Sequence, residues 1–280
     1  MRQLGEIHNR LLIFGGPYSN LAATRAMYEK AQQLQIAAGQ VICTGDLVAY
    51  CAEPQQTVDL IRDWGIAVVM GNCEESLGSN QADCGCGFKE GSTCSSLSIA
   101  WYEYANQRVN LDSRQWMMEL PRFIDFSIRG YRFKVVHGSV SSISQFVFPS
   151  TSAQLKEQQI TDAGTEVVIG GHSGIPFGQK LGSKLWLNAG VIGLPANDGS
   201  TDGWYMLLDQ DEGGFAASWH RLSYDAATSQ RSTRAAGMSE YALALGTGLW
   251  PSMEVLPPLE QGQQGKRLEL GPLRVDVHHA

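Results

Sequence analysis

Four side chains that can bind a metal ion follow short apolar runs and stand beside glycine. They are Asp46, Asn72, His137 and His172. Open α/β sheets bind ligands just beyond the carboxyl ends of their strands, which is where these residues are expected to lie. A carboxylate, an amide oxygen and two imidazoles suit Mn²⁺, Fe²⁺, Co²⁺, Ni²⁺ or Zn²⁺ better than Ca²⁺. We predict one divalent transition-metal ion here, and the alternative is a relic site that holds water or nothing.

The elements that must position these side chains alternate along the first half of the chain. The apolar runs at 10–14, 40–43 and 66–70 predict buried strands, and helices are expected after Asn20 and from Pro54. This β-α-β-α-β order predicts parallel strands with right-handed crossovers. Later strands are predicted at 123–128 and 131–136 (a hairpin around Arg129-Gly130), 167–170, 184–187, 204–208 and 215–222, with helices at about 96–107 and 235–245. The chain therefore combines a parallel half with a more antiparallel half.

Several motifs in this order resemble those of calcineurin-like metallophosphoesterases, and more closely the compact bacterial and archaeal phosphodiesterase branch. They are Gly45-Asp46, Gly71-Asn72-Cys73, His137-Gly138, Gly171-His172-Ser173-Gly174 and the segment 188–195, and the resemblance covers roughly residues 8–224. It implies an α/β fold, a four-layer α-β-β-α sandwich of two mixed β-sheets flanked by helices. It also implies two metal ions, bridged by one Asp, that activate a hydroxide and clamp a phosphate.

The resemblance assigns a complete ligand set to only one of the two ions. Asp46 matches the bridging carboxylate, and Asn72, His137 and His172 match the other protein ligands of the same ion. Of these, Asp46, Asn72 and His137 are the predicted catalytic residues.

Three ligands of the second ion are replaced. Gly16 stands at the position of an Asp, Tyr18 at that of a His, and Gly174 at that of the final His. Since all three changes affect the same ion, we expect no second metal.

Three further residues are candidates for contacting a substrate. Tyr18 is either a metal ligand, a nucleophile or a hydrogen-bond donor to phosphate, or else a packed ring that fills the space of the lost imidazole. Asn20 follows the same motif and is expected to begin a helix. Glu74 stands where the family usually has Asp, and either orients a neighbouring ligand, contacts substrate or is a solvated charge.

Residues 75–95 are rich in Gly, Ser and Cys, and predict a long ordered loop or insertion. With Cys73 upstream, the spacing of Cys84, Cys86 and Cys94 is compatible with a structural Zn²⁺ or an Fe–S cluster. The alternative is a set of buried or free thiols. For a cytoplasmic chain we expect thiols or ligands rather than disulfides.

Composition narrows the remaining function classes. The 280 residues are 43% hydrophobic, which predicts a globular protein, and the formal net charge is −7. Because no cluster of Lys and Arg is present, a nucleic-acid partner is not expected. No apolar run is long enough for a membrane span and no secretory signal is visible, so we expect no membrane association and a cytoplasmic location.

We divide the chain into a metallophosphoesterase-like domain at 1–245, which contains the insertion 75–95, and a tail at 246–280 that packs on the domain or is partly extended. A homo-oligomer remains open. The expected function is weak or narrow hydrolysis of a phosphomonoester or phosphodiester with a single metal ion, acting on a small phosphorylated molecule. The alternatives are a catalytically inactive homologue that binds a ligand or regulates, and a purely structural role.

Overall fold

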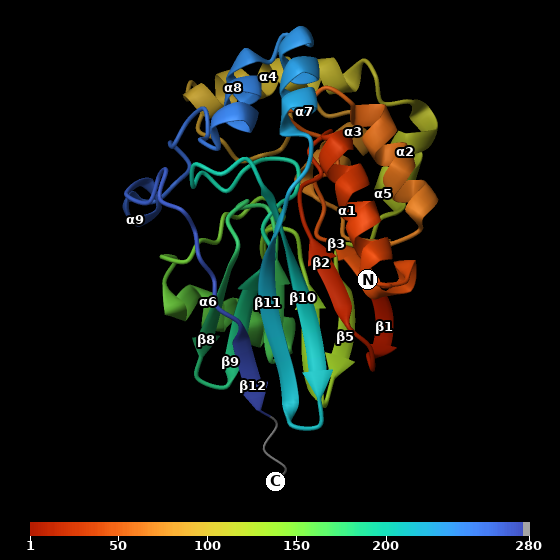
Figure 1. The fold of residues 1–280 in the computed structure, drawn as a ribbon, viewed down its shortest axis with the longest axis vertical. Coiled ribbons are helices and arrows are strands. Elements are labelled where there is room, and N and C mark those ends of the chain that lie inside the picture. The colour runs from red at the N-terminus through yellow and green to blue at the C-terminus, as the bar shows by residue number, and fades with distance from the viewer. Residues whose placement is uncertain (277–280) are drawn as a thin grey trace.

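Two six-stranded β-sheets form the centre of the molecule, and helices flank them (Figure 1). The computed structural model describes residues 1–276. The strands are β1 (Arg2–Glu6), β2 (Leu11–Phe14), β3 (Val41–Cys43), β4 (Ala67–Val68), β5 (Ile124–Ile128), β6 (Tyr131–Val135), β7 (Val167–Gly170), β8 (Phe177–Leu181), β9 (Lys184–Asn188), β10 (Gly203–Asp211), β11 (Gly214–Leu222) and β12 (Leu273–Asp276). The helices are α1 (Leu21–Gln33), α2 (Pro54–Trp64), α3 (Asn72–Gly78), α4 (Thr93–Asn106), α5 (Leu111–Glu119), α6 (Ala153–Ala163), α7 (Ala226–Ala235), α8 (Ser239–Thr247) and α9 (Pro258–Gln261), with a short 3₁₀ turn at Ala38–Gln40. Most helices lie beside β2 to β4 and at the upper end of the sheets in Figure 1.

Both sheets are mixed. One has the order β12-β11-β10-β2-β3-β4, in which β2, β3 and β4 are parallel and β10 to β12 pair antiparallel. The other has the order β1-β5-β6-β7-β9-β8, with parallel neighbours on both sides of β7. The four-layer sandwich expected from the sequence is therefore confirmed.

The buried strand β2 shows how the layers pack. Leu11 and Ile13 face the apolar core between the two sheets, whereas Leu12 and Phe14 face the core beneath the helices. Because a strand covered on both faces must be apolar at every position, the sequence shows a continuous apolar run instead of an alternation.

Two predicted helices begin where the sequence places them, for identifiable reasons. The side chain of Asn20 accepts a hydrogen bond from the Ala23 amide and caps α1. Pro54 occupies the first turn of α2, where its missing N–H costs nothing, and Gly65 ends the helix in a left-handed conformation.

Other predicted elements differ in the structure. The single helix predicted at 235–245 is wrong, because Gly237 adopts a positive φ of 89° and separates α7 from α8. The segment 75–95 is not a loop throughout, since α3 extends to Gly78 and Ser92 caps α4. The elements β1, α5, β8 and β12 were not predicted, and β12 places part of the 246–280 segment at the edge of a sheet.

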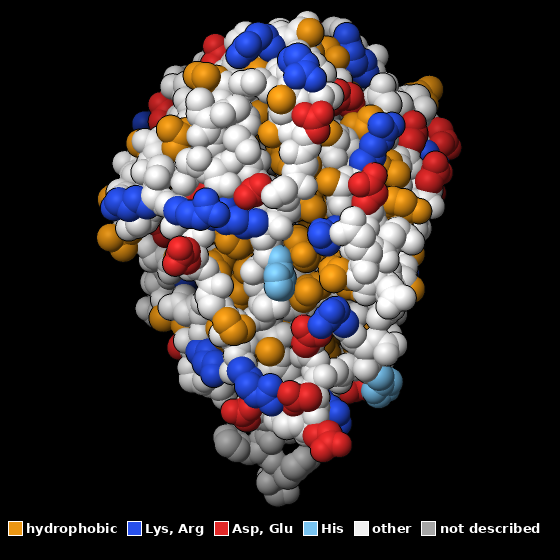
Figure 2. All heavy atoms as spheres, viewed as in Figure 1, with side chains coloured by type: hydrophobic (Ala, Val, Ile, Leu, Met, Phe, Trp, Pro, Cys, Tyr) orange, Lys and Arg blue, Asp and Glu red, His pale blue; other side chains and the backbone are white. Residues whose placement is uncertain are grey.

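The surface carries charges of both signs. On the face drawn in Figure 2, Lys and Arg side chains are interspersed with Asp and Glu, and hydrophobic atoms appear between them. Over residues 1–276, no helix combines the length and the apolar character that crossing a membrane requires.

Candidate metal centre

The four predicted ligands come from the ends of four strands, two in each sheet. Asp46 follows β3 and Asn72 follows β4, which are parallel neighbours in one sheet. His137 follows β6 and His172 follows β7, which are parallel neighbours in the other sheet. Because the carboxyl ends of these strands point to the same end of the sandwich, the four side chains meet there.

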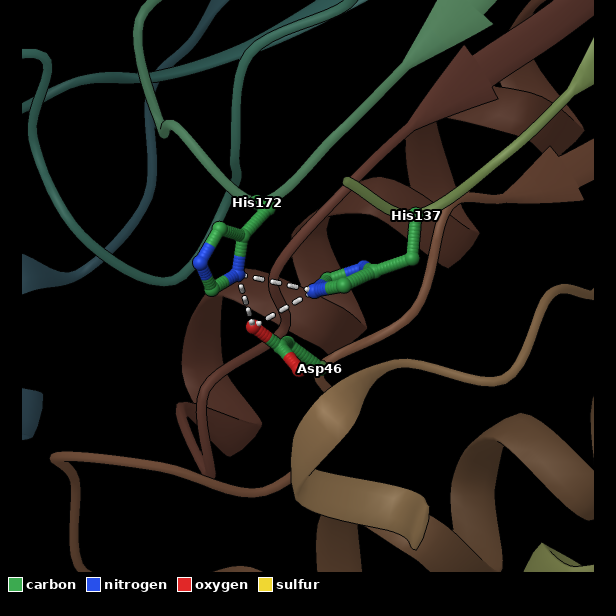
Figure 3. A group of neighbouring side chains, drawn as sticks. All are labelled: Asp46, His137 and His172. Carbon is green, nitrogen blue, oxygen red and sulfur yellow. Dashed lines mark hydrogen bonds and ion pairs between the residues drawn. The ribbon is translucent and has the colours of Figure 1, made fainter. Parts of the chain in front are cut away.

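The ligand atoms converge on one small volume (Figure 3). His137 Nε2 lies 3.2 Å from Asp46 Oδ2 and 3.1 Å from His172 Nδ1, and both contacts are drawn in Figure 3. The same nitrogen lies 3.0 Å from Asn72 Oδ1. His172 Nδ1 lies 3.9 Å from Asp46 Oδ2. All four residues are buried. Atoms of Asp46, His137 and His172 lie within 4.8 Å of one another, which is compact enough for all three to contact one ion.

Hydrogen bonds outside the cluster present lone pairs to its centre. His137 Nδ1 lies 2.7 Å from the carbonyl oxygen of Thr44. Since a carbonyl only accepts, Nδ1 carries the proton and Nε2 offers its lone pair. The Asn72 amide nitrogen donates to the carbonyl oxygen of Cys84 at 2.8 Å, which turns Asn72 Oδ1 toward His137. The donor set therefore fits a borderline divalent cation.

Two glycines permit the close packing around Asp46. A Cβ atom on Gly45 would lie 2.9 Å from His137 Nδ1, and one on Gly71 would overlap Asp46. Asp46 and His172 both adopt φ of 58°, a left-handed conformation that non-glycine residues seldom take. Strained residues of this kind concentrate at functional sites.

Glu74 holds the Asp46 loop in place. It is fully buried, and its Oε2 accepts hydrogen bonds from the amides of Asp46 (2.8 Å) and Gly71 (2.9 Å), while Oε1 accepts from that of Leu47 (2.7 Å). Burial and the negative charge of Asp46 raise the pKa of Glu74 to about 7. These contacts favour the ligand-orienting role among those considered for Glu74, because backbone amides already use both of its oxygens.

Burial and charge oppose each other in the ligand cluster. Burial favours a protonated Asp46, but the two histidines outweigh it and hold the pKa of this carboxyl well below its ordinary value. Burial disfavours a charged His137, yet Asp46 and its hydrogen bonds raise the pKa of this imidazole. The pKa of His172 is lowered, mainly by burial. The buried carboxylate of Asp46 beside two imidazoles therefore provides a site at which a cation is favoured.

Packed side chains occupy the side of the site where the resemblance places the second ion's ligands. A Cβ atom on Gly16 would lie 2.5 Å from Cζ of Tyr18 and 2.6 Å from Cγ1 of Val191. One on Gly174 would lie 3.2 Å from Cζ2 of Trp250. An Asp at position 16 would therefore collide with the Tyr18 ring. Glycine at 16 leaves the space that the tyrosine at 18 occupies.

Of the candidate substrate residues, Asn20 lies within the packed interior, whereas Tyr18 borders a pocket. Asn20 is fully buried and committed to structure, because its Nδ2 donates to the Gly193 carbonyl at 2.9 Å and its Oδ1 accepts from Ser229 Oγ at 2.6 Å. Tyr18 is buried, but its ring borders a pocket beside His172 and packs edge-on against Tyr50 at 4.7 Å.

The cysteines do not act as one group. Cys84 and Cys86 form a disulfide, so the expectation of thiols or metal ligands is wrong for these two residues. Their Cα atoms lie 5.3 Å apart, within the disulfide range, because Gly85 between them adopts a positive φ. Cys73 Sγ lies 3.5 Å from Asn72 Nδ2. Cys94 lies apart from the three others, and its amide donates to Glu254.

Several groups that shape the site were missed from the sequence. The carbonyls of Thr44 and Cys84 orient two ligands, and Trp250 reaches the site from the tail. A backbone carbonyl leaves no residue-type signal, and the position of Trp250 depends on a contact between distant parts of the chain.

A family model described as the calcineurin-like phosphoesterase superfamily domain matches residues 7–213. The chain therefore belongs to this superfamily. It is 25% identical over 237 residues to an uncharacterized protein of Methanocaldococcus jannaschii, covering 78% of this chain and 89% of that protein.

Two solved structures have a similar fold. A metallophosphoesterase of Sphaerobacter thermophilus gives a TM-score of 0.67 at 20% identity, with 87% of this chain and 100% of that chain covered. A hypothetical protein of Pyrococcus horikoshii gives 0.72 at 15% identity, with 86% and 99% covered.

Proposed function

We propose that this protein is a phosphoester hydrolase that uses a single divalent transition-metal ion held by Asp46, Asn72, His137 and His172. The observation that carries the proposal is the convergence of three buried ligand atoms on a fourth, His137 Nε2, each at 3.0 to 3.2 Å from that nitrogen. The substrate is a small phosphorylated molecule, either a monoester or a diester. In hydrolysis, a water oxygen bonds to phosphorus, the phosphorus–oxygen bond to the alcohol breaks, and that alcohol oxygen takes up a proton.

The chain's own residues prepare this reaction. An ion bound here would act as a Lewis acid toward a phosphoryl oxygen and would lower the pKa of water. Asp46 supplies the negative charge that attracts the ion, and His137 is held in the tautomer that leaves Nε2 free. Glu74 fixes the backbone of Asp46 through three amides.

A second candidate function follows from the packing of Tyr18 against Gly16. With one half of the two-metal clamp replaced, the protein would bind a phosphorylated ligand without turning it over. The two candidates differ in turnover and not in metal content.

The test combines metal analysis with hydrolysis. Chelator-treated protein reloaded with Mn²⁺ is expected to bind about one ion and to hydrolyse a generic aryl phosphodiester slowly. His137→Ala is expected to lower kcat/KM by more than about 100-fold, since even residues that merely orient a metal ligand contribute about 10- to 100-fold.

The matched control is His220→Ala. His220 lies on β11 and contacts Ser218 outside the site, so this variant should behave as wild type. Bound ion without turnover in the wild type would favour the ligand-binding candidate. If His137→Ala and His220→Ala hydrolysed the diester equally well, the proposed site would be wrong.

A further inference from the structure

A narrow pocket lies next to His172, on the side of the site that Gly16, Tyr18 and Gly174 border. Its volume is about 60 Å³. Tyr18, His172 and Gly174 form the wall toward the candidate metal centre. The opposite walls include Tyr50, Tyr241 and Trp250, while Phe88 and Phe146 contribute further rings. Among residues 1–276, no Lys, Arg, Asp or Glu side chain lines it.

Contacts between the rings hold this pocket in shape. Tyr50 lies between Tyr18 and Tyr241, with ring centroids 4.7 Å from each. The Phe146 ring lies 4.2 Å from that of His172. Trp250 is fixed at both ends of the residue, because its Nε1 donates to the Pro195 carbonyl at 2.6 Å and its backbone amide donates to Asn197 Oδ1 at 2.8 Å.

Much of the lining comes from parts of the chain that lie outside the family match at 7–213. Tyr241 belongs to α8, and Trp250 to Val255 follow it in the tail. At Gly174, a Cβ atom would already press on Trp250 at 3.2 Å. A histidine at 174 and the tryptophan at 250 therefore compete for the same space. The glycine that stands at the position of the final ligand therefore faces this aromatic wall directly.

We propose that this pocket binds a single uncharged ring, such as a phenyl group, that is attached to the phosphorus held at the metal centre. This inference rests on the proposed function and names its substrate class: a phosphoester in which one monocyclic apolar ring is attached to phosphorus through the ester oxygen, with the corresponding phosphonate as a probe that is not hydrolysed. The pocket adjoins the metal centre, because His172 lines the pocket and is also one of the proposed metal ligands.

Charge and size both select this occupant. An anionic group would lose its hydration in a pocket without cationic side chains, whereas an apolar ring gains from leaving water. A cavity that encloses a benzene ring measures roughly 150 Å³, so this open pocket of about 60 Å³ admits no more than one ring, and only part of that ring. A bicyclic ring system would be too large for it.

The experiment measures binding to the Mn²⁺-loaded full chain by calorimetry, with methylphosphonate, phenylphosphonate and 1-naphthylphosphonate as probes. Phenylphosphonate is expected to bind about 10-fold or more tightly than methylphosphonate, because only its ring enters the pocket. 1-Naphthylphosphonate is expected to lose that advantage. If the phenyl and methyl probes bind equally, or if no probe binds, the proposal is overturned.

A pair of variants tests the location. Ser252→Phe adds a ring to the lining of the pocket and is expected to abolish the preference for phenyl over methyl. Ser183→Phe adds the same ring in the exposed turn between β8 and β9 and should preserve it. If Ser252→Phe folds and keeps the preference, the ring binds elsewhere. If Ser252→Phe does not fold, the three-probe comparison in the wild-type protein still decides the proposal.

These readouts separate two kinds of failure. A phenyl preference in a protein without turnover supports the ring pocket and contradicts hydrolysis. Turnover without a phenyl preference supports hydrolysis and contradicts the ring pocket.

Discussion

At the scale of single residues, Glu74 links the polypeptide backbone to the candidate metal centre. Its two oxygens accept three backbone hydrogen bonds, from residues 46, 47 and 71, so it fixes both the Asp46 loop and the start of α3. Hydrogen bonds to charged groups are worth about 1.5 to 3 kcal/mol each, and more is lost when a buried donor is left without a partner.

Glu74→Gln tests this role. A glutamine amide offers one oxygen instead of two, so one or two of the three amides lose their acceptor. We expect the free energy of unfolding to fall by about 2 to 3 kcal/mol and the affinity for Mn²⁺ to fall by about 10- to 100-fold. Denaturant unfolding and calorimetric titration measure the two effects.

The neighbouring Glu75→Gln is the matched control. Glu75 is exposed and pairs with Arg122 at 3.1 Å, and exposed pairs contribute at most about 1 kcal/mol. Equal effects of the two substitutions on metal affinity would argue against a positioning role for Glu74.

At the scale of elements, the loop between α3 and α4 orients the Asn72 ligand. The carbonyl of Cys84 accepts from Asn72 Nδ2 at 2.8 Å, and Cys86 Sγ lies 3.4 Å from the same nitrogen. The Cys84–Cys86 disulfide constrains this turn next to the ligand. By holding the nitrogen of the Asn72 amide, the loop therefore leaves the amide oxygen facing His137.

Reduction of this disulfide is expected to weaken metal binding. A dithiol reductant would supply two electrons and two protons, become a cyclic disulfide itself and leave Cys84 and Cys86 as thiols. Because the turn would then be free to move, we expect the Mn²⁺ affinity to drop by about 10-fold, the size of a lost orienting contact. Thiol counting under denaturing conditions measures the reduction of the disulfide, and calorimetric titration measures the affinity for Mn²⁺.

The double variant Cys84→Ser, Cys86→Ser should reproduce the reduced protein and should not respond to the dithiol. Cys94→Ser changes a cysteine outside the disulfide and should respond as wild type does. Full Mn²⁺ affinity in the double variant would show that the cross-link does not position Asn72.

At the scale of the whole molecule, Asp198 connects the C-terminal segment to the sheet sandwich. The buried carboxylate contacts Arg221 of β11 at 2.6 Å and accepts from the Leu268 amide at 2.9 Å. Burial opposes the charge, but these partners outweigh it and lower the pKa of Asp198 below its ordinary value. The segment from Trp250 to Leu268 is thus held at both ends. The backbone amide of Trp250 donates to Asn197, the residue before Asp198, and the amide of Leu268 donates to Asp198 itself.

Asp198→Asn is expected to lower the free energy of unfolding by about 2 to 3 kcal/mol at pH 7, because removing one partner of a buried pair leaves the other charge uncompensated. A lowered folded-state pKa means that Asp198 stabilises the protein fully above its unfolded pKa of about 3.9. That stabilisation disappears as the pH falls through the folded-state pKa. The difference between wild type and variant should therefore shrink below about pH 4.

Urea unfolding from pH 3 to pH 7 measures this difference. Asp211→Asn, which breaks an exposed pair with Arg274, provides a comparison in which the loss at pH 7 should be much smaller. A difference for Asp198→Asn that stays constant across the range would rule out titration of this carboxylate as its cause.

The sequence predicts best those elements whose burial produces a recognisable pattern of apolar residues. The strand β2 reads as an apolar run because both of its faces are covered, and Asn20 and Pro54 mark the starts of α1 and α2. The strand β1 was missed because its side chains are largely exposed and alternate weakly. The apolar spacing over 235–245 predicts one helix, but Gly237 adopts a positive φ that ends α7 before α8 begins.

The sequence by itself determined the family fold and the residue types at the four strand ends. The order of apolar runs and polar residues along the chain is enough to predict the fold and the location of the four polar residues, because the carboxyl ends of parallel strands meet at one edge of an α/β sheet. Only the tertiary structure decided how these residues are used. Trp250 faces Gly174, Cys84 orients Asn72 and Glu74 binds the Asp46 loop through contacts between segments that are separate in the sequence. Such contacts depend on three-dimensional packing and on backbone groups, which have no counterpart in local sequence patterns.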